Sequence, residues 1–149
     1  MHLAQLNVGR AAHDLDSPEM AEFMGNLDRV NAIAERSPGF VWRMQDEAGN
    51  ATGIKPTDDP RFITNLSVWA DFESFEQFVW NTLHKQFYRR KAEWFEPLGR
   101  PHFVMWFVED GVRPALDDAL ARLADLTRNG PTDGAFGWER FTETESIAR

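Results

Sequence analysis

The decapeptide Arg61-Phe-Ile-Thr-Asn-Leu-Ser-Val-Trp-Ala70 has the clearest strand pattern in the chain. Successive side chains of a β-strand point to opposite sides, so this segment would present a different set of residues on each face. One face would carry Phe62, Thr64, Leu66 and Val68, and the other Ile63, Asn65, Ser67 and Trp69. Large apolar residues occur in both sets, which predicts a strand covered on both faces.

Further strands and helices are predicted before and after this strand. Ser17-Pro18-Glu19 is typical of a helix start, and apolar residues follow it at helical spacing. In chain order we predict a strand at 3–8, a helix from 18 to Ser37, strands at 40–45 and 61–70, a broken helix at 72–96, a strand at 102–108 and a helix at 114–126.

The order strand, helix, strand, strand, helix, strand is typical of a ferredoxin-like α+β domain. Such a domain has a four-stranded antiparallel sheet with helices on one face. We predict one such domain over residues 1–141, with 142–149 as a flexible tail.

The second face of this predicted sheet would have no cover within the chain. The strand pattern makes that face apolar, and an exposed apolar sheet is commonly covered by the same sheet of a second copy. We therefore expect a homodimer in which two sheets form a dimeric α+β barrel.

Composition and charge exclude several classes of function. The 149 residues suit one domain, and the 16 Lys and Arg against 24 Asp and Glu give a net charge of −8, which disfavours nucleic acid as a partner. The absence of cysteine excludes disulfides and thiolate chemistry. The sequence shows neither a secretory leader nor a membrane-spanning apolar run, so we expect a cytoplasmic protein with no membrane partner.

Polar residues interrupt the predicted strands in pairs two residues apart, so each pair shares a face. The pairs are Gln5 and Asn7, Arg43 and Gln45, and Asn65 and Ser67. With 12 Phe and 6 Trp in the chain, coinciding faces would place a polar patch inside aromatic walls, as in a small-molecule site. The alternative is a polar network that cross-links the dimer.

Three residues are candidates for catalysis. His84 titrates near neutral pH and lies one turn before Phe87, which suits acid/base chemistry; the alternative is a surface or capping histidine. Arg90 lies on the Phe87 and Trp94 side of the same predicted helix, where it could hold an anionic group or form a surface ion pair. Arg43 could stabilise a developing oxyanion.

Metal and cofactor motifs are not found. His102 could join His84 as a metal or haem ligand, but no ligand spacing supports the pair. No phosphate loop, dinucleotide fingerprint or nucleophile elbow is present. We therefore predict no metal and no cofactor, with haem as the alternative.

The chain resembles a bacterial family filed as domain of unknown function 3291. The resemblance rests on Ser67-Val68-Trp69, Phe75, Phe78-Val79, His84, Arg90, Trp94-Phe95, Met105-Trp106-Phe107-Val108, Gly111, Arg113-Pro114, Gly130-Pro131 and Ala135-Phe136. That family is similar in turn to the dimeric α+β barrel superfamily, which includes cofactor-free antibiotic-biosynthesis monooxygenases, haem enzymes, muconolactone isomerases and polyketide cyclases. The resemblance implies the fold and the dimer more than a reaction.

From these observations we expect a pocket between sheet and helices that binds and converts a small hydrophobic or aromatic molecule. The chemistry would be cofactor-free and acid/base, of monooxygenase, isomerase or cyclase type. The predicted substrate-binding residues are Trp42, Asn65, Ser67, Trp69, Phe87, Trp94 and Trp106. The alternatives are a non-catalytic binder of a hydrophobic acid or haem, and a purely structural dimer.

Overall fold

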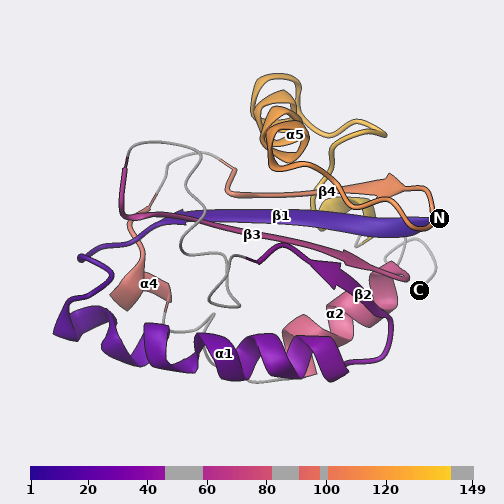
Figure 1. The fold of residues 1–149 in the computed structure, drawn as a ribbon. Helices are drawn as coiled ribbons and strands as arrows, with labels where there is room; N and C mark the ends of the chain where they lie inside the picture. Colours follow the sequence, from indigo (N-terminus) through magenta and orange to yellow (C-terminus); the bar gives the residue numbers. More distant parts are fainter. Residues whose placement is uncertain (46–58, 82–90, 98–100, 142–149) are drawn as a thin grey trace.

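The computed structural model describes residues 1–45, 59–81, 91–97 and 101–141 (Figure 1). Its strands are β1 (His2–Arg10), β2 (Phe40–Arg43), β3 (Phe62–Trp69) and β4 (Phe103–Val108). Its helices are the 3-10 turn η1 (Pro18–Met20), α1 (Ala21–Arg36), α2 (Phe72–Asn81), α4 (Lys91–Trp94) and α5 (Leu116–Asn129). Both described parts of the predicted broken helix are helical, and the residues between them lie outside the described part of the chain.

The four strands form one sheet in the order β2-β3-β1-β4, with all neighbours antiparallel. The two central strands, β1 and β3, are therefore the first and third in the sequence, as in the ferredoxin-like arrangement. Leu3 pairs with Trp69, and the register continues without a break to Arg10 and Phe62. The predicted α+β class is confirmed.

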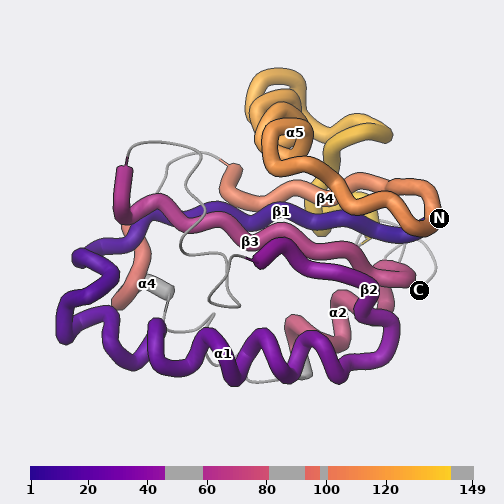
Figure 2. Tube along the Cα trace, in the orientation of Figure 1, coloured from indigo at the N-terminus to yellow at the C-terminus, as the bar shows by residue number. Residues whose placement is uncertain are grey.

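The helices lie on both faces of the sheet (Figures 1 and 2). Helices α1 and α2 lie on one face, which we call the α1 face; it carries the odd-numbered residues of β1, from Leu3 to Gly9. Helix α5 lies on the other, the α5 face, which carries Ala4, Leu6 and Val8. The predicted arrangement placed all helices on one face, so the position of α5 is a difference from it.

Helix α5 covers the sheet face that was expected to be bare. Its buried residues Ala119, Leu123 and Leu126 pack in one cluster with strand residues such as Leu6 and Trp106. In β1, β3 and β4 the residues of this cluster are all at most 6% exposed within the single chain. The expectation of a face without cover was wrong, because the amphipathic C-terminal helix folds back over it. The homodimer stays a prediction. The uncovered apolar face from which it was argued is not present in the described part of the chain.

The α1 face has apolar clusters at its two ends. The first, the Trp69 cluster, packs Leu3, Trp69 and Met105 against Phe75 and Phe78 of α2. The second, the Trp94 cluster, packs Ala11 against Met20 and Trp94. The two clusters have no buried residue in common, so this face has two separate apolar ends.

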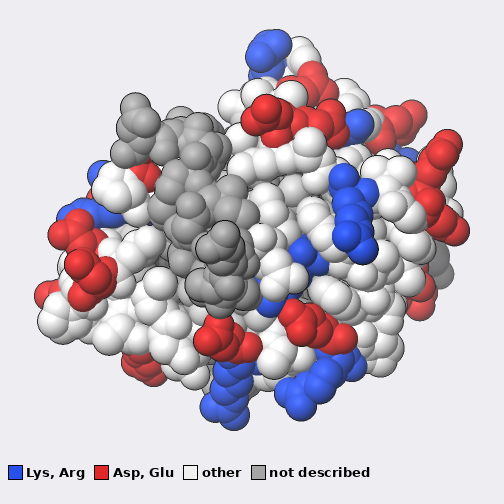
Figure 3. Space-filling model, in the orientation of Figure 1, with Lys and Arg blue, Asp and Glu red and all other residues white. Residues whose placement is uncertain are grey.

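The surface in Figure 3 carries acidic side chains over α5 and around the margins, with basic side chains placed among them. This mixture agrees with the net charge of −8. Of the helices in the described part of the chain, none is long and apolar enough to cross a membrane.

Candidate functional site

Polar residues occupy the middle of the α1 face, between the two apolar clusters. We call Gln5, Asn7, Asn65 and Ser67 the polar row. Gln5 is the register partner of Ser67, and Asn7 is the partner of Asn65. Because partners in a sheet point to the same side, all four share the α1 face, as the predicted polar patch requires.

Four side chains of this region form a hydrogen-bonded relay. Gln5 Nε2 donates to Asn65 Oδ1 and to Ser67 Oγ, both at 2.7 Å. The indole Nε1 of Trp69 also donates to Ser67 Oγ, at 3.0 Å. Gln5 and Ser67 are only 3% and 6% exposed, so the relay is almost closed to water at these two residues.

Within the described part of the chain, the relay leaves two donors unused. Ser67 Oγ accepts two hydrogen bonds, which fills its lone pairs and leaves its own hydrogen to donate. Asn65 Oδ1 accepts from Gln5, so the Nδ2 group of Asn65 remains as a donor. An oxygen atom of a bound molecule is the group that such a pair of donors suits.

Solvent reaches the α1 face at Asn65. This residue is exposed although its face is the one that α1 covers, and Asn7 beside it is half-buried. Ala34 is the one buried residue of α1, while Leu27 and Val30 on its apolar side stay half-buried. The layer between the sheet and α1 is therefore incompletely packed, unlike the ends of the same face.

The Trp94 end of the site depends on a glycine. A Cβ atom at Gly9 would lie 2.9 Å from the ring of Phe95, closer than carbon atoms pack. Ala11 pairs with Phe95 in an isolated bridge, which draws the end of α4 against β1. Trp94 is 2% exposed and packs on Phe23 at 5.4 Å between ring centroids. Trp94 is thus part of the core here, although the sequence predicted it to touch a substrate.

Arg43 is held by an ion pair. It pairs in register with Ser67, so it lies on the α1 face next to the polar row. Its Nε donates to Glu35 Oε1 of α1 at 2.8 Å, and its side chain is 11% exposed. The predicted catalytic arginine therefore carries a carboxylate partner at the edge of the site, which reduces the positive charge it can offer.

The structure does not gather all of the predicted site residues. Asn65, Ser67 and Trp69 lie together on the α1 face. Trp42 pairs with Val68 on the opposite face, and Trp106 packs there beneath α5 at 1% exposure. The predicted residues His84, Phe87 and Arg90 lie outside the described residues. Trp42 and Trp106 cannot share a site with the polar row, because the sheet separates them.

The sequence placed Gln5 in the predicted polar patch but did not include it among the predicted substrate-binding residues, yet it is the centre of the relay. The signal that identifies it is its position: it is a glutamine between the apolar residues Leu3 and Ala4 on one side and Leu6 on the other, in a strand buried on both faces. A buried amide in such a strand needs hydrogen-bond partners, and those partners lie on the neighbouring strand.

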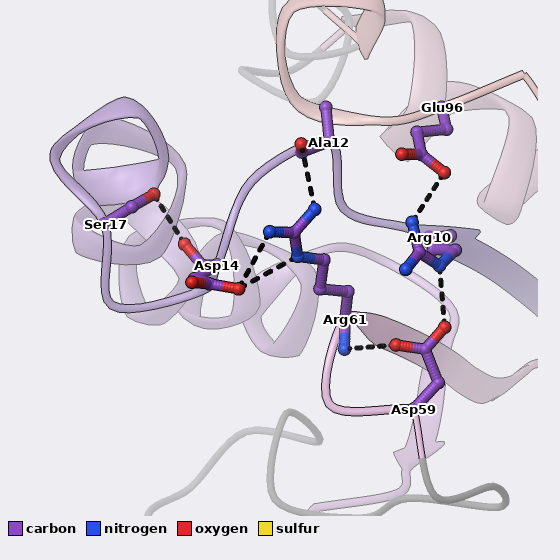
Figure 4. Close-up of polar contacts among 7 residues, drawn as sticks. All are labelled: Arg10, Ala12, Asp14, Ser17, Asp59, Arg61 and Glu96. Carbon is purple, nitrogen blue, oxygen red and sulfur yellow. Dashed lines mark hydrogen bonds and ion pairs between the residues drawn. The ribbon is translucent and has the colours of Figure 1, made fainter.

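A network of charged side chains joins the end of β1 to the segments around Asp14, Asp59 and Glu96 (Figure 4). Arg10 donates to Asp59 Oδ2 and to Glu96 Oε2, both at 2.7 Å. Arg61 donates from its backbone to Asp59 and from its guanidinium to Asp14, both at 2.9 Å. The backbone N–H of Arg61, followed by the Arg10 side chain, lowers the pKa of Asp59, and the hydrogen bonds to Asp59 and then Glu96 raise the pKa of Arg10. Every cation shown has a carboxylate partner, so this network is structural.

In the part of the chain that the structure describes, no ionisable group takes part in the relay itself. Among the described residues, none of the hydrogen bonds of Gln5, Asn65 or Ser67 goes to a histidine or a carboxylate. The same part of the chain contains no group of three or more His, Cys, Asp or Glu side chains placed to hold a metal ion. The described site therefore supplies hydrogen-bond donors and aromatic walls.

Comparisons with known proteins support the fold. A family model described as Domain of unknown function (DUF3291) matches residues 2–149. A point variant of SnoaB, a cofactor-independent oxygenase from Streptomyces nogalater, is similar with a TM-score of 0.50 and 16% identity, covering 76% of this chain and 98% of that one. A protein of unknown function from Nitrosomonas europaea also has a TM-score of 0.50, with 13% identity over 76% of this chain and 95% of its own.

A third similar structure is a dabb family protein with a ferredoxin-like fold from Mesorhizobium loti, with a TM-score of 0.45 and 18% identity over 74% of this chain and all of its own. Comparison with curated proteins finds none that matches the sequence. At these identities, the two structures with a TM-score of 0.50 show that the fold is shared. They carry no information about the reaction.

Proposed function

The chain belongs to the family described as Domain of unknown function (DUF3291), and we propose that it binds and converts a small hydrophobic or aromatic molecule in the layer between the sheet and α1. The observation that carries this proposal is the polar row with its two unused donors, set between two apolar clusters. Apolar walls with a few convergent polar groups are typical of small-molecule sites.

The geometry suits a substrate with a carbonyl, enol or phenol oxygen. A hydrogen-bond donor directed at such an oxygen stabilises negative charge that develops there during a reaction. Ser67 and Asn65 each supply such a donor, and the aromatic ring of Trp69 forms the adjacent wall. The ring system of a conjugated substrate would lie against the apolar residues and exclude water from the reacting oxygen.

The proposed chemistry is cofactor-free and of monooxygenase, isomerase or cyclase type. SnoaB, which shares the fold, is a cofactor-independent oxygenase, and this supports the type of reaction without fixing it. We assign the proton transfer to His84 and the stabilisation of charge to Arg90 and Arg43, as the sequence predicts. The test of His84 is turnover by His84→Gln, which should fall while binding is kept.

Native mass spectrometry of freshly purified protein, with an absorption spectrum of the same sample, tests the site first. A retained organic mass is expected, and two-dimensional NMR should show its loss or replacement as shifts at Gln5, Asn65 and Ser67. Shifts confined to the α5 face would contradict the proposal. The same spectra measure the mass of the assembly, and hence the predicted homodimer, while a Soret band would identify haem as the ligand.

A non-catalytic binder is the second candidate. The observation that favours it is that, among the described residues, no histidine or carboxylate bonds to Gln5, Asn65 or Ser67. The nearby Glu35 carboxylate is ion-paired with Arg43. In that case the ligand would be bound and released unchanged. His84→Gln would then change neither the affinity for the ligand nor the chemical form in which it is released.

A further inference from the structure

We propose that Gln5 is the positioning residue that fixes the hydrogen-bond polarity of this site, so that the site presents donors and selects ligands by a hydrogen-bond acceptor. This inference rests on the proposed function, because it specifies which chemical group of the ligand the polar row recognises. It concerns a residue that touches the ligand only through Asn65 and Ser67.

The orientation of the Gln5 amide follows from its neighbours. Its Nε2 atom lies 3.4 Å from the backbone oxygen of Asn65, in addition to its 2.7 Å contacts with Asn65 Oδ1 and Ser67 Oγ. A backbone carbonyl oxygen can only accept, so the amide atom that faces it must be the donor. Rotating the amide by 180° would place Gln5 Oε1 against the backbone oxygen of Asn65, in a site almost closed to water.

The orientation of Gln5 sets that of Asn65. The Gln5 donor is satisfied by Asn65 Oδ1, so the other end of the Asn65 amide, its Nδ2 group, points away from Gln5. Asn65 is the exposed member of the relay, and its Nδ2 group is therefore the one that an incoming molecule meets.

The orientation of Ser67 is set from two sides. The indole N–H of Trp69 can only donate, and Gln5 Nε2 donates to the same oxygen. The Ser67 hydroxyl hydrogen must then be directed elsewhere, and it has no acceptor among the described residues. A buried hydroxyl with an unused hydrogen is unfavourable until a ligand supplies an acceptor.

Glutamine is the residue type that this position requires. A glutamate could not donate to both partners, and an apolar side chain of equal length would leave Asn65 and Ser67 free to turn. The side-chain amide supplies two N–H bonds, and the structure uses one toward each partner. At Asn65 and Ser67 the site therefore has a fixed polarity before any ligand binds.

Hydrogen exchange of the side-chain amides tests the polarity without a ligand. In NMR spectra of the whole protein, the Gln5 NH2 group should exchange slowly, because both hydrogens are bonded and the residue is 3% exposed. The Asn65 NH2 group should exchange fast. The reverse pattern, with Asn65 protected and Gln5 fast, would overturn the proposal.

Three tricyclic probes of nearly the same shape test the selection by acceptors. Fluorenone carries a carbonyl acceptor, carbazole carries an N–H donor, and fluorene carries neither. We expect fluorenone to bind about fivefold more tightly than fluorene, the value of one net hydrogen bond, and carbazole to bind more weakly than fluorene. A preference for carbazole over fluorene would overturn the proposal.

The variant Gln5→Met keeps the length of the side chain and removes its hydrogen bonds. It should reduce the fluorenone preference, taken as the ratio of the fluorenone and fluorene affinities of the same variant, from about fivefold to about onefold. The control is Thr64→Val, a change of a buried hydroxyl on the opposite face, which should keep the full preference. A Gln5→Met protein that is less stable but keeps the preference would show a purely structural role and contradict the proposal.

The two proposals fail in different ways. If the exchange pattern is as expected but none of the three probes binds, the polarity of the relay stands and the proposed binding function fails. If the probes bind without regard to their polar group, the binding function stands and the role of Gln5 fails. Should Gln5→Met not fold, the exchange pattern of the unaltered protein still decides.

Discussion

The indole nitrogen of Trp69 donates a hydrogen bond to the hydroxyl oxygen of Ser67, two residues earlier on the same face of β3, at 3.0 Å. This bond joins the aromatic end of the α1 face to the polar row. The ring of Trp69 is itself stacked on Phe78 at 5.1 Å and meets Phe40 edge-on at 5.4 Å. Packing of the indole therefore fixes the position of a hydroxyl in the candidate site.

Replacing Ser67 by alanine should destabilise the protein by about 1–3 kcal/mol, because it leaves the Trp69 N–H and one Gln5 N–H buried without an acceptor. Urea denaturation followed by tryptophan fluorescence measures this change. Thr64→Val is the matched control: Thr64 is also buried in β3, but its hydroxyl has no partner among the described residues, so its removal should be neutral or stabilising. Equal losses in the two variants would contradict the relay.

Gly39, between α1 and β2, should tolerate no larger residue. Its φ is +82°, which disfavours any side chain, and a Cβ atom there would collide with Ser74. We expect Gly39→Ala to cost about 2–4 kcal/mol, from strain and overpacking together. Gly111 has a similar φ of +88° with no atom within 4 Å, so Gly111→Ala measures the backbone part alone, about 1 kcal/mol. Thermal unfolding of both variants gives the difference.

Asp71 caps the start of α2. Its Oδ1 accepts the backbone N–H of Ser74 at 2.8 Å, and this bond, followed by one from the Ser74 side chain, lowers the pKa of Asp71. Asp71→Ala should cost about 1 kcal/mol at neutral pH, whereas Asp71→Asn keeps an oxygen acceptor and should cost less. Circular dichroism during urea denaturation checks both values. An alanine variant as stable as the asparagine variant would exclude a capping role.

The Asp59 network should make the protein sensitive to acid. Because the folded protein lowers the pKa of Asp59, its carboxylate stabilises the fold above the unfolded-state pKa of about 4, and this contribution is lost as the pH falls through the folded pKa. Asp59→Asn should therefore be less stable than the unaltered protein at pH 7, with the difference shrinking toward pH 3 and in high salt. A difference that grows on acidification would contradict this sign.

The strands and their polar faces could be predicted because alternation is a local property of the sequence. The pattern at Asn65 and Ser67 gave the face that β3 presents, and the structure adds only the register with Gln5 and Asn7. One error was avoidable on the same grounds. Trp42 and Arg43 are adjacent in a strand, so they cannot both face one site, and the structure places them on opposite faces.

The side on which α5 packs could not be predicted in this way. Its apolar stripe shows that one side of the helix is buried, but a stripe does not say which face of a sheet it meets. The choice depends on the path of the chain after β4, where Gly111 has a positive φ and beyond which α5 packs on the Trp106 side. Trp106 for the same reason became a core residue beneath α5 instead of a substrate contact.

Leu123 should show whether α5 or a second copy covers this sheet face. The residue is 9% exposed and packs in the cluster that contains Trp106. If α5 is the cover, Leu123→Ala should cost about 2–4 kcal/mol, whereas the half-buried neighbour Leu120 should cost less when replaced by alanine. Because the cover belongs to the same chain, the loss at Leu123 should be the same at protein concentrations about tenfold apart. A small loss, or one that shrinks as the concentration rises, would mean that a second copy displaces α5 and stabilises the face instead.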